Sequence, residues 1–501
     1  MSFLLTTLLL AVGALAQNAL NVQSTGNPLL ADGSFYSADP APFVAGDTFY
    51  ILSGRDEAGP TRNDFIMNQW MLWSSKTPNP VGQWTLNTNV ATPSALFTWA
   101  TSGRAYASQI VPGRDGKFYM YASAYQARSS DADPFAIGVA VSDTPSGPWR
   151  DAKGGPIISQ SIMKNNIHNI DPTVLIDTDG KVYLYWGSFN QLYGTEIASD
   201  MVTPVGSPVR VTSLTGFFEA SWLMKRNSTY YMLYAGNNAG ASSPCTPTSY
   251  HACIAYGTAP SPLGPWTYRG TILDIVSSTT SHSGAVQFGT KWYFTYHTAD
   301  AANATHFRRS IAMDEMTFDD TQSPPRINKI VPSRRPAAPR PPTRNIAPAA
   351  KVSSPSRTPI QYWIEAVHNA KIPTNPLPPD YWSSYAGASS PATSTLVYES
   401  PAPVQINAAR MVFFADQPAG ATIGVAPPRE WRVEYLTAGG TWSAVRNTGP
   451  YPTVVSDAAP EVGFETVTTR SVRAVLSASG GSGGYAGIGV KEWEVWAPTP
   501  L

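Results

Sequence analysis

Residues 171–186 read DPTVLIDTDGKVYLYW: a carboxylate, an apolar strand, a tight turn and a second strand rich in aromatic residues. Asp179-Gly180 is typical of the turn that joins two antiparallel strands, because both residue types tolerate a positive φ. The same pattern recurs four more times, twice without a carboxylate at its start, and the Tyr of the second strand always lies 11 or 12 positions after the first residue. Those four stretches begin at Asp39, Ala107, Glu219 and His282. The chain therefore contains a repeated β-hairpin.

The spacing of the repeats predicts the architecture. Successive repeats start 68, 64, 48 and 63 residues apart, which is room for a four-stranded antiparallel unit with loops of variable length. Three units close on a related motif, at Pro80-Val-Gly-Gln-Trp84, Ser146-Gly-Pro-Trp149 and Leu263-Gly-Pro-Trp266. Five such units arranged radially predict a five-bladed β-propeller over residues 17–335. Because the innermost strand of each blade lines the axis, the first residues of the repeats should meet in one central cavity.

Three of those first residues are carboxylates, Asp39, Asp171 and Glu219, and a fourth is His282. A single strand-initial carboxylate is most simply a turn cap, but three in one register favour a shared function. Carboxylates crowded in a desolvated cavity acquire different pKa values, so one can act as a base and another as an acid. Hydrolysis of a glycosidic bond needs that pair, and a separation of about 6.5–9.5 Å would admit a water and invert the anomeric centre. The third carboxylate would orient the acid and raise its pKa.

Composition narrows the class of protein. The 501 residues carry 34 basic and 34 acidic side chains, and only 14% are charged, against about 25% in typical proteins. This balance argues against nucleic acid or an anionic membrane as a partner. The 45 Pro, 39 Gly and 11% aromatic residues favour a β-rich chain, and 43% hydrophobic residues exclude a wholly disordered one.

The N-terminus predicts secretion. Residues 1–16 contain an apolar run that ends in a small-x-small site, which is typical of a signal peptide and too short to span a bilayer. A buried N-terminal segment is the alternative. Cys245 and Cys253 are expected to pair as one local disulfide in an oxidising compartment. Asn227 and Asn303 head glycosylation sequons.

Residues 26 to 335 resemble glycoside hydrolase family 43. The motifs that carry the resemblance are Ser37-Ala-Asp39-Pro-Ala-Pro, Asn169-Ile-Asp171-Pro-Thr, Phe218-Glu219-Ala-Ser and Ser261-Pro-Leu-Gly-Pro-Trp266. The resemblance implies a five-bladed propeller that acts on arabinose- and xylose-containing polysaccharides. It also implies that Asp39 is the general base, Asp171 the pKa modulator and Glu219 the general acid. His282 would be an axial histidine that contacts a water shell or a calcium ion, although a structural role stays open, and no cofactor is expected to be required.

Sugar recognition needs flat apolar faces and planar hydrogen-bond donors. The candidates near the expected cavity are Trp99, Tyr106, Trp186, Phe218 and Arg309. We favour Arg309 over its neighbour Arg308, and for the aromatic residues a role in the core between blades stays open. Residues 54–57, Gly-Arg-Asp-Glu, either line the rim of the cavity or form surface salt bridges. Related propellers that cleave fructans use a Glu-Cys acid motif, whereas here Ala220 follows the candidate acid.

The C-terminal third forms a separate unit. Residues 336–358 are rich in Pro and predict a linker or an extended strap. Over residues 359–501, alternating apolar and polar positions such as 431–436 and 490–496 predict a β-sandwich of the jelly-roll type. From about 345 to 498 the chain resembles the discoidin (coagulation factor 5/8 C-terminal) family, which implies a carbohydrate-binding module. A purely structural appendage is the alternative.

We therefore expect an all-β chain with a five-bladed β-propeller followed by a β-sandwich. The expected function is that of a secreted, monomeric, inverting exo-glycosidase that releases arabinofuranosyl units from arabinoxylan-type polysaccharide. β-Xylosidase activity is the alternative within the same class. A non-catalytic carbohydrate-binding propeller is the alternative from another class, and a costly cluster of buried carboxylates weighs against it.

Overall fold

The computed structural model describes residues 19–236, 253–278, 280–333, 345–356, 362–378, 380–481 and 483–498. Residues 1–16, predicted to be a signal peptide, and Cys245, predicted to pair with Cys253, lie outside these ranges. In the ranges given, no helix is long and apolar enough to cross a membrane.

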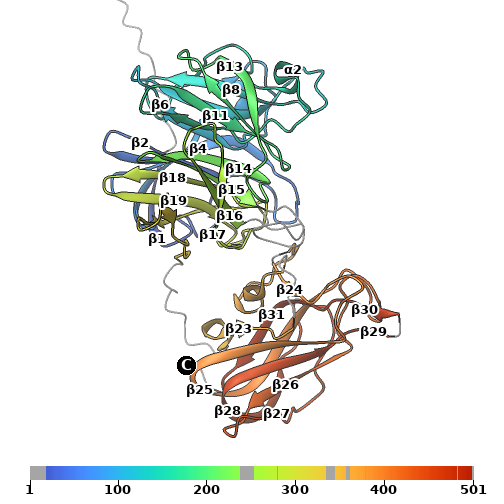
Figure 1. Cartoon of the computed structure of the whole chain (residues 1–501). Coiled ribbons are helices and arrows are strands. Elements are labelled where there is room, and N and C mark those ends of the chain that lie inside the picture. Colours follow the sequence, from blue (N-terminus) through green and yellow to red (C-terminus); the bar gives the residue numbers. More distant parts are fainter. Residues whose placement is uncertain are drawn as a thin grey trace, which may run out of the picture.

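Five antiparallel sheets follow one another along the first two thirds of the chain and form the upper body in Figure 1. In the first sheet the order is β1 (Ala19–Thr25), β5 (Val81–Ala91), β4 (Met67–Ser75), β3 (Thr48–Asp56) and β2 (Tyr36–Ala45). The second contains β6 (Ser108–Pro112), β7 (Phe118–Tyr125), β8 (Phe135–Ser142) and β9 (Arg150–Asp151). The third contains β10 (Thr173–Ile176), β11 (Val182–Trp186), β12 (Leu192–Ile197) and β13 (Pro204–Val211). The fourth contains β14 (Glu219–Arg226), β15 (Thr229–Gly236), β16 (Cys253–Ala259) and β17 (Thr267–Leu273), and the fifth β18 (Ser283–Phe288), β19 (Lys291–Thr298) and β20 (Ser310–Met316). The predicted five-bladed β-propeller is confirmed.

The repeated hairpins form the two inner strands of each blade. In the third blade, Ile176 pairs with Val182 across the Asp179-Gly180 turn, where Gly180 has a φ of 92°. Two short helices, α1 (Pro93–Leu96) and α2 (Gln160–Met163), lie in connections between blades. Large aromatic side chains fill the space between the sheets, among them the fully buried Trp70, Trp73 and Trp84.

The innermost strands close a ring around the axis. Strands β2, β6, β10, β14 and β18 contact one another in that order, and β18 contacts β2. The approach at this last junction is so close that a Cβ at Gly284 would lie 2.3 Å from Cδ of Pro42. The N–H of Leu29 also donates to the carbonyl oxygen of Ile311 on β20 (2.9 Å), and the N–H of Ser37 on β2 donates to that of Arg309, which directly precedes β20 (2.7 Å). The first and last blades are therefore joined both where β18 contacts β2 and by these hydrogen bonds beside β20.

The C-terminal part forms a β-sheet domain with its own core, drawn below the propeller in Figure 1. Its strands are β23 (Lys351–Ser353), β24 (Trp382–Ser383), β25 (Thr393–Phe414), β26 (Glu430–Leu436), β27 (Trp442–Ala444), β28 (Val462–Ser477) and β31 (Gly489–Trp496). Its smaller elements are the hairpin of β29 (Gly480–Gly481) with β30 (Gly484–Tyr485) and the 3₁₀ helices η1 (Ala347–Ala349) and η2 (Ile364–His368). The short hairpin of β21 (Phe318–Asp319) with β22 (Arg326–Ile327) belongs to the propeller, where Ile327 is part of the core. The long strand β25 pairs with β28 over residues 393–409 and with β31 over residues 408–414, with register shifts in both pairings. This arrangement is consistent with the predicted β-sandwich, while the resemblance to the discoidin family stays a prediction.

One predicted boundary needs correction. Residues 345–356 were expected to belong to the linker 336–358, but β23 pairs with β25 and the N–H of Ile346 donates to the carbonyl oxygen of Val495 (2.8 Å). Val352 is buried between the exposed Lys351 and Ser353, which is the alternation of a strand. A strand of only three residues, next to a Pro-rich stretch, is too short to be recognised from the sequence pattern.

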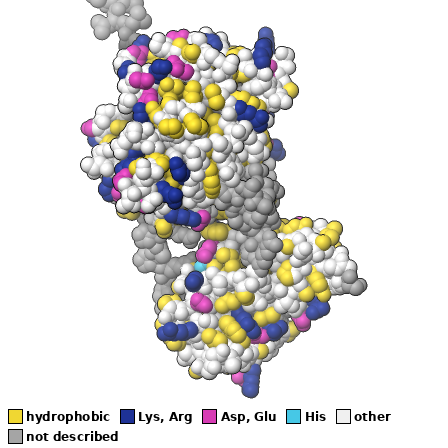
Figure 2. Space-filling view, in the orientation of Figure 1, with side chains coloured by type: hydrophobic (Ala, Val, Ile, Leu, Met, Phe, Trp, Pro, Cys, Tyr) yellow, Lys and Arg dark blue, Asp and Glu magenta, His cyan; other side chains and the backbone are white. Residues whose placement is uncertain are grey.

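The two parts also touch. The ammonium group of Lys371 donates to the carbonyl oxygen of Ala299 (2.9 Å), and Nδ2 of Asn375 donates to Oδ1 of Asn63 (2.7 Å). On the face seen in Figure 2, basic and acidic side chains are interspersed on both parts, in line with the zero net charge.

Candidate active site

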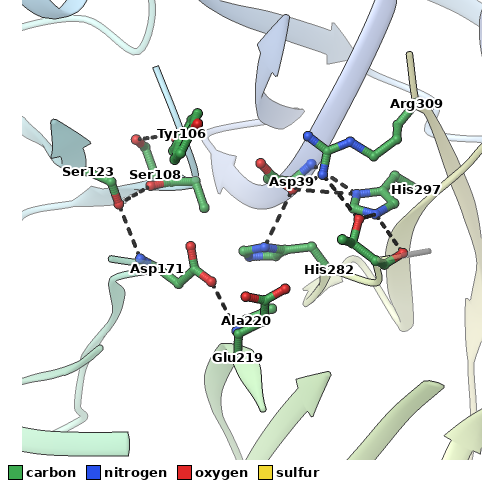
Figure 3. A network of polar contacts seen from close by, with 12 residues as sticks. Asp39, Tyr106, Ser108, Ser123, Asp171, Glu219, Ala220, His282, His297 and Arg309 are labelled. Atoms are coloured by element: carbon green, nitrogen blue, oxygen red, sulfur yellow. Dashed lines mark hydrogen bonds and ion pairs between the residues drawn. The ribbon is translucent and has the colours of Figure 1, made fainter. Parts of the chain in front are cut away.

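A cavity of about 560 Å³ lies where the innermost strands meet, and its lining includes Asp39, Asp171, Glu219 and His282. Figure 3 shows the three carboxylates and the imidazole facing one another from different blades. The prediction that the first residues of the repeats meet in one cavity is confirmed for these four. Ala107, the first residue of the second repeat, is buried and does not line the cavity.

An unusual backbone conformation recurs beside the three carboxylates. Asp39, Asp171 and Ala220 have φ angles of 56°, 57° and 57°, a region that residues other than glycine rarely adopt. The register of β2 shifts between Ala38 and Ala41, and that of β14 shifts between Glu219 and Trp222. Such strain persists where the surrounding structure requires it, and it is concentrated at functional sites.

Asp39 is the carboxylate with cationic surroundings. Nη1 of Arg309 donates to its Oδ1 (3.1 Å), and Nδ1 of His282 and Nδ1 of His297 lie 3.7 and 3.6 Å from the same oxygen. Burial works to raise the pKa of Asp39, but the pKa is lowered overall, and the guanidinium of Arg309 is the largest of the effects that oppose burial. Asp39 is therefore ionised and suited to accept a proton.

Arg309 is fixed by a second carboxylate. Its backbone N–H and Nε donate to Oδ2 of Asp56 (2.8 Å each), and its Nη2 donates to Oδ1 (3.0 Å). Arg308 instead lies over the ring of Tyr36, at 4.2 Å. Arg309 lines the cavity and Arg308 does not, while the role of Arg309 in sugar binding stays a prediction. Asp56, within the 54–57 stretch, is buried, whereas Arg55 and Glu57 pair with each other at 3.4 Å.

His297 was not among the predicted site residues. Its Nδ1 accepts the N–H of Asp39 (3.2 Å) and its Nε2 faces the carbonyl oxygen of Thr280 (3.0 Å), which places the proton on Nε2. Burial and Arg309 lower the pKa of His297 to about 3, so the ring is neutral. The one available signal was a histidine at the end of the aromatic strand of the fifth repeat.

Asp171 and Glu219 form the opposite environment. Burial, followed by the charges of Glu219 and Asp39, raises the pKa of Asp171 well above its usual value. Burial also raises the pKa of Glu219, against the hydrogen bond that Ser188 donates to its Oε2 (2.9 Å). Oδ2 of Asp171 accepts the N–H of Ala220 (3.1 Å), which ties the two blades together. The pKa values on this side of the cavity are therefore raised, whereas that of Asp39 is lowered.

Two of the five predicted sugar-binding residues, Tyr106 and Arg309, line the cavity. The prediction for Trp186 is wrong, because its side chain is fully buried and its Nε1 donates to Oδ1 of Asn169 (2.9 Å). Trp99 donates to Asp151 and Phe218 packs edge-on against Phe189, and neither of them lines the cavity. The sequence pattern does not reveal which face of a blade an aromatic side chain will occupy.

A wall of rings that the sequence did not predict lines the cavity beside Tyr106. Phe135 stacks on Tyr106 with ring centroids 5.2 Å apart and meets His168 edge-on at 4.8 Å. His168 in turn meets Phe189 at 5.4 Å, and its Nδ1 contacts a carboxylate oxygen of Asp133. On the other side of Tyr106, Phe65 lies under the guanidinium of Arg309 at 4.9 Å. These rings supply the apolar faces that sugar binding requires.

The cavity does not fit a calcium ion held directly by the protein. Calcium takes about six to eight oxygen ligands. Across the described residues, no group of three or more His, Cys, Asp or Glu side chains is arranged to hold a metal. His282 faces Asp39 and Arg309 instead, and burial lowers its pKa. The contact of His282 with a water shell or a calcium ion stays a prediction, and no step of the reaction is derived through calcium.

Comparison with known proteins identifies the family. The model of "Glycosyl hydrolases family 43" matches residues 26–324. The chain belongs to glycosyl hydrolase family 43. A xylosidase/arabinosidase from Bacteroides ovatus is 30% identical over 328 residues, covering 57% of this chain and 92% of the relative. The family match and such relatives make the chain a glycoside hydrolase of the arabinofuranosidase or β-xylosidase group.

Solved structures of family 43 agree with the fold. A β-xylosidase/α-arabinofuranosidase from a compost microbial metagenome, in complex with xylotriose, has a TM-score of 0.52 and 26% identity and covers 62% of this chain and 99% of its own. An arabinoxylan arabinofuranohydrolase from Bacillus subtilis is 19% identical with a TM-score of 0.51. It covers 95% of this chain and 98% of its own, so the likeness of fold extends through the C-terminal domain.

Proposed function

We propose that this family 43 enzyme is an inverting exo-glycosidase that releases arabinofuranosyl units from arabinoxylan-type polysaccharide. Asp39 removes a proton from a water as its oxygen attacks the anomeric carbon, and Glu219 gives a proton to the departing glycosidic oxygen. The products are the free sugar and the shortened acceptor, and one proton has moved from the water to Asp39 and one from Glu219 to the acceptor. Asp171 accepts the N–H of Ala220 and so keeps the adjacent Glu219 in place, and we assign it the role of pKa modulator.

One observation carries this proposal: three carboxylates line one cavity, Asp39 and Asp171 buried and Glu219 partly buried, and Arg309 contacts only Asp39 among them. The pKa of Asp39, beside Arg309, is lowered, whereas those of Asp171 and Glu219 are raised. General acid–base catalysis of glycoside hydrolysis requires such a difference in pKa.

The cavity also suits a small sugar unit. Its volume lies within the range of about 300–1,000 Å³ typical of small-molecule sites, and its walls combine aromatic rings with a few convergent polar groups. The Bacteroides ovatus relative is named for both xylosidase and arabinosidase activity. We place arabinofuranosidase first and β-xylosidase second.

The substitution Glu219→Gln tests the acid. We expect kcat on an arabinoxylan oligosaccharide to fall by at least about two orders of magnitude, because a poor leaving group needs a general acid. Glu196→Gln is the matched control, since Glu196 lies on β12 outside the cavity and pairs with Lys181. Wild-type activity of Glu219→Gln would remove Glu219 from this role.

A comparison of substrates separates the two activities. We expect the purified enzyme to have a higher kcat/KM on an α-L-arabinofuranoside than on the β-D-xyloside of the same leaving group. The opposite order would make β-xylosidase the main activity and leave the acid–base assignment intact.

We also propose that the protein acts outside the cell as a monomer, after removal of residues 1–16. The motif at the end of the apolar run and the two sequons, Asn227 and Asn303, both at exposed positions, support secretion. N-terminal sequencing of protein from culture medium should begin at Gln17. Retention of residues 1–16 would contradict it.

A further inference from the structure

Phe189 is an exposed aromatic residue at the edge of the cavity. Its side chain is 59% exposed, although phenylalanine is normally buried, and it lines the cavity that contains the three carboxylates. It is the first of two consecutive residues with positive φ, 50° at Phe189 and 66° at Asn190. A large side chain held in a strained backbone and left in solvent is most simply explained by a ligand that covers it.

The surrounding contacts hold the ring in place. It meets His168 and Phe218 edge-on, both with ring centroids 5.4 Å apart. The N–H of Asn190 donates to the carbonyl oxygen of Phe218 (3.1 Å), and the N–H of Gln191 donates to that of Ser188 (3.2 Å). The loop is therefore fixed at both ends of the strained pair, and the ring is preorganised for binding.

The same loop locates this ring relative to the chemistry. Ser188, the residue before Phe189, donates to Oε2 of Glu219 at 2.9 Å. The proposed acid stands beside the glycosidic oxygen, so the sugar that departs with that oxygen occupies the side of the cavity on which Glu219 and the 187–191 loop lie.

We propose that Phe189 is a binding residue for the leaving-group sugar, a pyranose unit of the polysaccharide main chain, which stacks on the exposed face of the ring. This proposal rests on the proposed function, because the acid defines the leaving-group side. It goes further by naming a residue that distinguishes a polysaccharide from a free monosaccharide. The flat apolar face of a pyranose matches an aromatic ring, and its hydroxyl groups remain in water at this open edge.

The test measures binding in the Glu219→Gln background, so that oligosaccharides are not consumed. Calorimetry gives the dissociation constants of two matched pairs: xylotriose with xylose, and arabinofuranosyl-xylotriose with arabinose. The ratio of the monosaccharide constant to the oligosaccharide constant measures the contribution of the leaving-group side. We expect Phe189→Ala to lower this ratio about tenfold for the pair that the enzyme prefers, the size of effect that loss of one aromatic contact produces.

Two further variants make the result specific. Phe189→Trp should restore the ratio to within about twofold of the parent, because it supplies another flat ring. Val209→Ala, at an exposed apolar position on β13 outside the cavity, should leave the ratio unchanged. Near-ultraviolet circular dichroism checks that each variant is folded.

An unchanged ratio in folded Phe189→Ala would overturn the proposal, as would a parent that binds oligosaccharides no more tightly than monosaccharides. Neither result would affect the assignment of Asp39 and Glu219. If Glu219→Gln instead hydrolysed the oligosaccharides at the wild-type rate, the proposed acid would be wrong, which is a separate and distinguishable failure.

Discussion

At the scale of single residues, Ser188 offers a direct test of the pKa of the proposed acid. Its hydrogen bond to Oε2 of Glu219 (2.9 Å) lowers the pKa of that carboxyl, against the larger opposing effect of burial. Ser188→Ala should therefore raise the pKa further. Because the acid must be protonated to act, the alkaline limb of the kcat/KM profile should move to higher pH, by roughly half a unit to one unit.

Ser213→Ala is the matched control, because Ser213 donates to the carbonyl oxygen of Trp266 away from the cavity. A limb that stays in place or moves to lower pH in Ser188→Ala would contradict the pKa assignment of Glu219.

The acidic limb tests Asp39 in the same way. Arg309→Gln removes the cation that, after the opposing effect of burial, does most to lower the pKa of Asp39. The base must be ionised to act, so raising its pKa should move the acidic limb of kcat/KM to higher pH. An acidic limb at the wild-type position in a variant that still turns over would show that Asp39 is not the base.

The sequence predicts which residues meet in the cavity where the repeat gives them equivalent positions. Asp39, Asp171 and Glu219 open their hairpins in one register, so their convergence followed from the spacing alone. Asp56 and His297 act through contacts across distant segments, with Arg309 and with the backbone of Asp39. Contacts between residues so far apart in the chain cannot be predicted from the repeat pattern.

At the scale of elements, the junction of β18 with β2 closes the propeller. A Cβ at Gly284 would lie 2.3 Å from Cδ of Pro42 and 3.1 Å from the carbonyl oxygen of Pro40, and neither atom belongs to a flexible side chain. Gly284→Ala should therefore force the strands apart and destabilise the protein by about 1–3 kcal/mol, seen as a lower urea midpoint of tryptophan fluorescence.

Gly155→Ala is the matched control, since a Cβ there has no atom within 4 Å. If Gly284→Ala unfolded at the same urea concentration as Gly155→Ala, the ring would not be closed as tightly as described.

Strands were predictable from the sequence where a turn motif and an alternating apolar pattern marked them. Asp-Gly turns between apolar and aromatic strands located the inner hairpins, whereas the three-residue β23 was absorbed into a Pro-rich stretch. Its pairing with β25 stabilises it, and the sequence of β23 alone does not encode that pairing.

At the scale of the whole molecule, the C-terminal domain contacts the propeller near the cavity. Oδ2 of Asp380 lies 3.0 Å from Nε2 of the buried His306. The next residue, Phe307, packs on Phe65, which lines the cavity, with ring centroids 4.7 Å apart. Asp380→Ala should loosen this contact, lowering stability by about 1–3 kcal/mol and raising KM several-fold with a smaller change in kcat.

Asp143→Ala, at an exposed position 4.0 Å from Arg150, is the control. Wild-type stability and KM in Asp380→Ala would show that the two domains act independently. The sequence predicted both domains but not this contact, because it depends on surfaces that meet only after each domain has folded.

The stereochemistry of the first product tests the central claim most directly. Proton NMR of the sugar released in the first seconds, before mutarotation, reports its anomeric configuration. Attack by a water that Asp39 activates, opposite the oxygen that Glu219 protonates, predicts that the first-formed anomer has the configuration opposite to that of the bond cleaved. A first-formed anomer of retained configuration would require a covalent intermediate and would contradict the assignment of Asp39 as a base.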